Sequence, residues 1–192
     1  MKAIMISISP QYVEKILNGG KTIEIRKTMP KCELPCKVYI YCTKGKKLYK
    51  CVLTFDEDLL NGKVVAEFTL NKVDILERDL NDWLPKNRYD ISNELLKDIN
   101  LNQNELWNYG QGKTLYAWHI DDLKIYDKPK ELSEFSHFIP NNKCPTKQCG
   151  TNCEDCPNYD EEHETCLALY YAHRAIKRPP QSYCYVEELE DE

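Results

Sequence analysis

The chain opens with an alternating apolar pattern that then changes to helical spacing. Every second residue from Ile4 to Ile8 is isoleucine, and a two-residue period predicts a β-strand. Ser9-Pro10 follows; the hydroxyl can cap free backbone N–H groups, and proline suits the first helical position. Apolar residues within 12–17 then share one helical face, and Gly19-Gly20 ends the helix. A short strand and a short helix therefore begin the fold.

Residues 21–27 alternate again and predict a second strand. Its period buries Ile23 and Ile25 and presents Thr22, Glu24 and Arg26 on the opposite face. This polar face carries both signs of charge next to a glycine pair. It is therefore the first candidate for a binding surface.

Further strands and one more helix are predicted along residues 38–126. Strand-like runs cover residues 38–41, 64–73 and 114–126, whereas residues 91–107 have helical spacing. Strands and helices without regular βαβ alternation predict an α+β fold, a small curved sheet or open barrel with flanking helices. Pro129 predicts the end of the main domain, which divides the chain into residues 1–128 and a tail of residues 129–192.

Composition places the chain among folded proteins. It has 192 residues, of which 42% are apolar and 30% charged, an ordinary globular balance. No stretch approaches the ~20 consecutive apolar residues of a membrane helix, and no basic segment precedes an apolar run at the N-terminus. We therefore expect a cytoplasmic protein that is not embedded in a membrane.

Charge is distributed unevenly. Residues 1–50 hold eleven Lys or Arg and three Glu, net +8, whereas the rest holds fifteen basic and twenty-eight acidic residues, net −13. A basic block can create a local positive field on an acidic protein and attract nucleic acid. A lysine-rich solvated face explains the same composition.

The order of several short motifs resembles the ASCH family of the PUA-like superfamily. They are Gly19-Gly20-Lys21-Thr22-Ile23-Glu24-Ile25-Arg26 after Ile8-Ser9-Pro10, then residues 116–120 (YAWHI) and 126–129 (YDKP). Residues 179–188 (PPQSYCYVEE) resemble a C-terminal signature of phage-type members. The resemblance covers residues 3–128. It implies a small PUA-like β-barrel with a cleft beside the first helix, and binding of RNA or a modified base.

Six residues are the candidate ligand-binding set on this basis: Lys21, Thr22, Glu24, Arg26, Tyr12 and Trp118. Arginine donates two parallel hydrogen bonds, lysine supplies a mobile charge, and Glu24 can accept from an exocyclic amino group. The aromatic rings, with Tyr39 and Tyr41, can stack on a single-stranded base. A surface ion pair and buried core aromatics are the structural alternatives.

A hydrolase is the alternative function. One branch that the sequence resembles looks like amidases of acetylated cytidine, and Lys21 matches their lysine, although their threonine three positions later is Glu24 here. Lys21, Glu24 and Glu67 are then the acid–base candidates. His119 fits either a general base or a hydrogen-bonded structural histidine.

Cysteines gather in the predicted tail. Five of them, four of which would bind one metal ion, are Cys144, Cys149, Cys153, Cys156 and Cys166. A Cys-x-x-Cys pair plus a second ligand pair suits structural zinc, which would provide folding energy to a segment with few apolar residues. Unliganded thiols, disulfides and an iron–sulfur cluster are the alternative states of these cysteines. The acidic end, Glu187–Glu192, is a possible contact for a protein partner.

Overall fold

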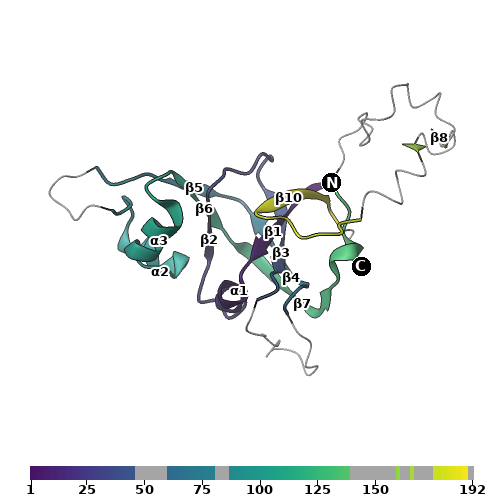
Figure 1. Ribbon diagram of the computed structural model, residues 1–192, viewed down its shortest axis with the longest axis horizontal. Coiled ribbons are helices and arrows are strands. Elements are labelled where there is room, and N and C mark those ends of the chain that lie inside the picture. The colour runs from purple at the N-terminus through teal and green to yellow at the C-terminus, as the bar shows by residue number, and fades with distance from the viewer. Residues whose placement is uncertain (46–59, 81–86, 139–158, 161–164, 167–174, 190–192) are drawn as a thin grey trace.

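The computed structural model describes residues 1–45, 60–80, 87–138, 159–160, 165–166 and 175–189 (Figure 1). Two sheets organise these residues, and helices lie beside each. Within this part of the chain, no helix has both the length and the apolar character needed to cross a bilayer.

The larger sheet has five strands in the order β10-β1-β3-β4-β7. Strand β1 (Lys2–Ile8) runs parallel to β3 (Cys36–Cys42) and antiparallel to β10 (Tyr183–Glu187). Antiparallel pairing then adds β4 (Val64–Leu70) and β7 (Asp121–Lys130). The N-terminal strand is thus an interior strand whose edge neighbour comes from residues 183–187.

The smaller sheet has three antiparallel strands in the order β2-β6-β5. These are β2 (Ile23–Arg26), β6 (Leu115–His119) and β5 (Val73–Leu76). Helices α2 (Asn93–Ile99) and α3 (Gln103–Gly110) pack against it and lie together at one end of the molecule in Figure 1. A turn of 3₁₀ helix, η1 (Leu132–Glu134), and a short pair, β8 (Tyr159–Asp160) with β9 (Thr165–Cys166), complete the described elements.

Both faces of the larger sheet are buried, which explains the apolar character of β1 on both sides. Ile4, Ile6 and Ile8 join one core cluster with α1 (Pro10–Leu17) and Trp118, whereas Ala3 and Met5 join another on the opposite face. A strand covered on two sides reads as a nearly continuous apolar run. The predicted period of two is confirmed, and each set of alternating residues has its own core.

Helix α1 begins and ends where the sequence predicts, but its first turn is capped differently. Pro10 is the first helical residue and Gly19 adopts φ +75° just after the end. Ser9 has the extended backbone of an N-cap, yet its side chain makes no capping bond. Its carbonyl accepts hydrogen bonds from the N–H groups of Tyr12 and Val13. The expected hydroxyl cap is therefore wrong.

Three segments that were predicted as single elements are each divided in two. Residues 64–73 split into β4 and β5, and residues 114–126 split into β6 and β7, because the chain passes from one sheet to the other. Residues 91–107 split into α2 and α3 at Asn100, whose φ is +55°. Asn102 then starts α3 through a capping box with Glu105. Apolar periodicity continues across such breaks and does not reveal them.

The fold class is α+β, as predicted. The described strands form separate sheets rather than one continuous closed ladder. Pro129 lies inside β7, and β10 belongs to the larger sheet although the sequence-based division places it in the tail. Residues 175–189 therefore complete the main fold.

Gly110 offers a test of the packing between α3 and the smaller sheet. A Cβ atom at this position would lie 1.9 Å from the hydroxyl of Tyr89, a fully buried residue that donates a hydrogen bond to the Lys113 carbonyl. We expect Gly110→Ala to lower the free energy of unfolding by about 1–3 kcal/mol through overpacking. Urea denaturation measures the change. Asn108→Ala, on the exposed side of the same helix, is the control and should change it by less than about 0.5 kcal/mol.

Candidate ligand-binding site

Strand β2 presents its side chains as the sequence predicts. Ile23 and Ile25 pack in the core cluster beneath α2 and α3, and Thr22 is exposed just before the strand. Glu24 and Arg26 lie on the opposite face. In the antiparallel register with β6, Glu24 is opposite Trp118, so the two predicted residues share a face.

Lys21, Glu24 and Arg26 form one buried group, which we call the charge cluster. Their exposed fractions are 2%, 7% and 6%. Oε2 of Glu24 lies 3.5 Å from Nζ of Lys21, and Oε1 lies 3.4 Å from Nη1 of Arg26. One carboxylate therefore bridges two cations, which leaves a net charge of +1 away from water. The surface ion pair considered from the sequence is not what forms.

Lys21 is held between α1 and α2. Its Nζ donates a 2.8 Å hydrogen bond to the carbonyl of Ile99, the last residue of α2, and its backbone N–H donates to Lys15. Burial lowers the pKa of Lys21 from its ordinary value of 10.5, and Glu24 opposes this shift. The lysine thus serves as a buried anchor rather than a mobile surface charge.

Arg26 connects β2 to the edge of the larger sheet. Nη1 donates to the Ser7 carbonyl at 3.1 Å, and Nη2 donates to the Ser182 carbonyl and, at 3.1 Å, to its Oγ. Ser7 belongs to β1 and Ser182 directly precedes β10. Sequence reasoning missed Ser182 because nothing in its local pattern indicates a contact with a residue so far away in the chain.

Two buried N–H donors beside this cluster have no hydrogen-bond partner among the residues that the structure describes. They are Nε of Arg26 and the indole Nε1 of Trp118, a fully buried residue. Buried polar groups in folded proteins are almost always paired, since an unpaired donor costs about 1–3 kcal/mol. An acceptor supplied from outside the chain would satisfy both the donors and the excess positive charge.

Aromatic rings surround the cluster. The ring of Tyr12 lies 5.8 Å from Nζ of Lys21, and that of Tyr183 lies 5.9 Å from the ring of Trp118. Partial burial raises the pKa of Tyr109, and the charges of Arg26 and Glu24 act on that phenol in opposite directions. We call Tyr12, Tyr109 and Tyr183 the aromatic rim. The sequence indicated only Tyr12 of these three.

The other predicted aromatic residues lie elsewhere. Tyr39 and Tyr41 belong to the core cluster on the opposite face of the larger sheet from Trp118. Trp118 itself is a core residue in contact with the rim. The structural alternative thus holds for the rings on β3 and also for Trp118, whose ring in addition lies against Tyr183 of the rim.

Glu67 and His119 are not brought together with Lys21. Glu67 accepts a 2.6 Å hydrogen bond from the Tyr126 hydroxyl and lies 3.7 Å from Nζ of Lys37. It is opposite Tyr39 in the sheet and shares that face rather than the face of Trp118. His119 bonds the carboxylate of Asp74 at 2.7 Å, the arrangement of a structural histidine.

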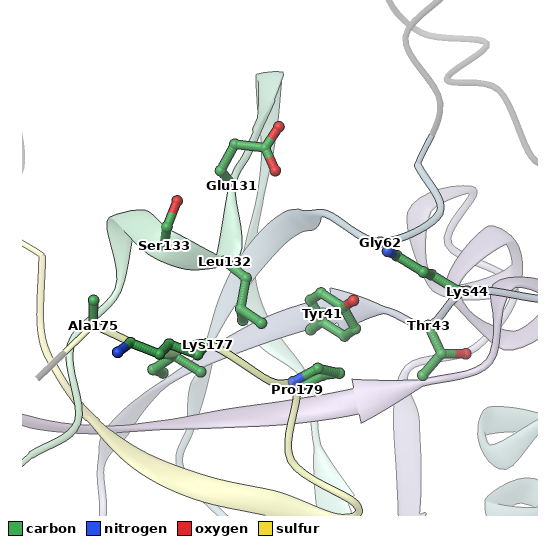
Figure 2. Close-up of a pocket in the computed structure, with 11 residues that line it drawn as sticks. Tyr41, Thr43, Lys44, Gly62, Glu131, Leu132, Ser133, Ala175, Lys177 and Pro179 are labelled. Carbon is green, nitrogen blue, oxygen red and sulfur yellow. The ribbon is translucent and has the colours of Figure 1, made fainter. Parts of the chain in front are cut away.

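Two hollows in the described part of the chain bear on the predicted residues. Figure 2 shows the larger of these, about 790 Å³, between the ends of β3 and β7 and the chain before β10; Tyr41, one of the rings predicted to stack on a base, lines it, whereas the six residues of the candidate ligand-binding set do not. The second, about 530 Å³, is lined by Lys15, Leu96, Lys97, Asn100, Leu101, Asn102 and Glu105. Lys15 donates to Oδ1 of Asn100 at 2.8 Å, next to the carbonyl that binds Lys21. This second hollow therefore adjoins the charge cluster and carries basic groups.

The predicted zinc ligands in the tail lie outside the described residues, apart from Cys166 in β9, whose side chain is also outside them. Structural zinc stays a prediction. Within the ranges that are described, no group of three or more His, Cys, Asp or Glu could hold a metal ion. The described start of the acidic end contacts the larger sheet: Glu188 pairs with Lys37 at 3.4 Å, and the Leu189 N–H bonds the Tyr39 hydroxyl.

Comparisons with known proteins return solved structures alone: no protein-family model and no curated protein matches the chain. A crystal structure of an ASCH protein from Zymomonas mobilis is similar at 19% identity and a TM-score of 0.47, covering 76% of this chain and 83% of that one. Two point variants of the same protein give 19% and 20% identity, TM-scores of 0.46 and 0.45, and coverage of 77% and 76% of this chain and of 87% and 84% of theirs. The names of these structures include ASCH, the family that the sequence motifs resemble.

The buried state of Lys21 makes a prediction for stability. The pKa of Lys21 in the folded protein lies below 10.5, its value in the unfolded chain. At a pH between these two values, the unfolded chain therefore binds more protons at Lys21 than the folded protein does. The free energy of unfolding contributed by this residue should therefore rise with pH across that window, up to about pH 10.5. Urea titrations at several alkaline pH values, on the native chain and on Lys21→Met, measure it. The free energy of unfolding of the native chain minus that of Lys21→Met should increase with pH. A value that does not change with pH would contradict the prediction.

Proposed function

We propose that this protein binds a nucleobase, in single-stranded RNA or as a modified nucleoside, at the charge cluster and aromatic rim. The observation that carries the proposal is the pair of unpartnered buried donors, Nε of Arg26 and Nε1 of Trp118, beside a buried net charge of +1. A core selected for stability alone would not keep an excess cation and two unpaired donors together. A ligand rich in hydrogen-bond acceptors accounts for both.

A nucleobase has the chemistry that this arrangement needs. Its carbonyl oxygens and ring nitrogens accept hydrogen bonds, which suits Arg26 and Trp118, and an exocyclic amino group donates, which suits Glu24. Its flat face stacks on rings such as those of Tyr12 and Tyr183. Residues that can form hydrogen bonds with the edge of a base thus lie near rings that can stack on its face. Thr22, exposed just before β2, adds a hydroxyl beside the charge cluster.

Lysines near the cluster suit the phosphates of an RNA strand; Lys97 and Lys27 are exposed, and Lys15 is half-buried. Lys15 and Lys97 line the adjoining hollow, and Nζ of exposed Lys27 lies 4.6 Å from the Tyr109 ring. Phosphate contacts supply affinity without sequence preference and weaken as salt rises. The buried charges would then read the base, while these lysines would attract the backbone.

Replacing Arg26 tests the proposal. Arg26→Lys keeps the positive charge but removes Nε, the guanidinium donor without a partner among the described residues, so it should weaken binding by about tenfold or more, the value of one hydrogen bond from a charged group. Fluorescence anisotropy with labelled single-stranded RNA of mixed sequence measures the affinity at two salt concentrations. The salt dependence should change little, because the cluster is buried and the charge is retained.

Lys128→Ala is the matched control for this experiment. It removes an exposed lysine from β7, the edge of the larger sheet opposite β10, and should leave affinity within about twofold of native. Thermal melting of all three proteins establishes that they are folded. Equal affinity of folded Arg26→Lys and native protein would remove the charge cluster from RNA binding.

An amidohydrolase acting on acetylated cytidine is a second candidate function, favoured by one observation. Burial lowers the pKa of Lys21, and Glu24 lies 3.5 Å from its Nζ. A lysine with a lowered pKa next to a carboxylate is an arrangement used for proton transfer in enzymes. Glu67 takes no part in this version, because it sits in a different network.

Incubation of the protein with N4-acetylcytidine separates the two functions. Hydrolysis consumes water and yields cytidine and acetate, which chromatography detects directly. Turnover that Lys21→Met reduces by about a hundredfold or more would support the enzyme. Binding of the nucleoside without release of acetate would leave the binding function and exclude this reaction.

A further inference from the structure

The loop between β2 and β3, residues 27–35, brings two thiols into contact at its end. Sγ of Cys32 lies 2.8 Å from Sγ of Cys36, and both cysteines are free. A disulfide bond has a sulfur–sulfur length of about 2.05 Å, so an approach of only about 0.8 Å would bring these atoms to bonding distance. Three residues lie between the two cysteines in sequence, and the loop turns so that both side chains meet.

The two cysteines differ in accessibility. Cys32 is half-buried between exposed Lys31 and Glu33, whereas Cys36 begins β3 and has an exposed fraction of 8%. A reagent from solution therefore reaches Cys32 first. Cys36 then lies in position behind it, as a resolving thiol must. Burial, together with the neighbouring Cys32, raises the pKa of Cys36, and the ammonium of Lys2 opposes that shift.

We propose that Cys32 and Cys36 form a modification site that low-molecular-weight disulfides such as glutathione disulfide convert reversibly to an intramolecular disulfide. The Cys32 thiolate attacks one sulfur of glutathione disulfide, which gives a mixed disulfide and releases one glutathione thiolate. Cys36, on losing its proton, attacks the Cys32 sulfur, and the second glutathione leaves as its thiolate. Two protein thiols are oxidised, and one glutathione disulfide is reduced to two glutathione molecules.

This loop also connects the two ends of the described chain, so its redox state bears on the fold there. The Lys31 carbonyl accepts a 2.8 Å hydrogen bond from Nζ of Lys2, and the Lys31 N–H donates at 2.9 Å to the Tyr185 hydroxyl. The Met29 carbonyl accepts from Tyr183 at 3.4 Å. A bond between Cys32 and Cys36 would restrict a segment that is hydrogen-bonded to β1 and β10. This effect does not depend on a ligand at the charge cluster.

The sequence permits a direct measurement. Trypsin cleaves after Lys31 and Lys37, and the peptide between these sites contains both cysteines, whereas residues 38–44 form a peptide with Cys42 alone. Native protein is equilibrated in glutathione buffers of increasing oxidised fraction, quenched with acid, denatured, alkylated and digested. We expect the 32–37 peptide to change from two alkyl groups to none, with the loss of two hydrogens in its mass. The Cys42 peptide, from a fully buried thiol, should stay alkylated.

Single variants establish the order of reaction. In Cys36→Ser, Cys32 should accumulate a glutathione adduct that cannot resolve; in Cys32→Ser, Cys36 should react about tenfold or more slowly because it is buried. Two results would overturn the proposal. One is a 32–37 peptide that keeps both alkyl groups at every buffer ratio, and the other is a separate glutathione on each cysteine of the native protein.

Discussion

The carboxylate of Glu24 is the contact on which the described structure most depends. It lies between two buried cations: Lys21 reaches back to the end of α2, and Arg26 reaches across to β1 and to the residue before β10. Breaking a buried ion pair by removing one partner is far more costly than losing an exposed one, since the remaining charge has no water. The joint between the two sheets therefore requires this acid, whatever the site binds.

Local features of this arrangement could be predicted from the sequence, and long-range ones could not. A strand places alternate residues on opposite faces, so the shared face of Glu24 and Arg26 followed from spacing alone. Whether that face was exposed or buried depended on what covered it, and the covering residues include Ser182, which has no local signal. The changes of sheet after β4 and β6 also have no local signal, because apolar alternation along a strand is the same in either sheet.

Glu24 and Glu67 show how position in the fold assigns different roles to similar residues. Each is an acidic residue at an inner position of a strand, and each is mostly buried. Glu67 accepts a hydrogen bond from Tyr126 and lies near Lys37 and Lys124, and Lys37 also pairs with Glu188 just after β10. Glu24 faces unpartnered donors and aromatic rings instead. Sequence alone ranked the two acids together, and their neighbours separate them.

The pairing of β10 with β1 also sets the order in which the fold can assemble during synthesis. Strand β1 leaves the ribosome before β10, so its antiparallel neighbour and the Ser182 contact of Arg26 exist only after residues 182–187 have emerged. Until then an interior strand has an open edge, which is a template for pairing with other chains. Nascent chains would therefore be most prone to misassociation between the emergence of β1 and that of residues 182–187, and slower elongation over this stretch would prolong the interval.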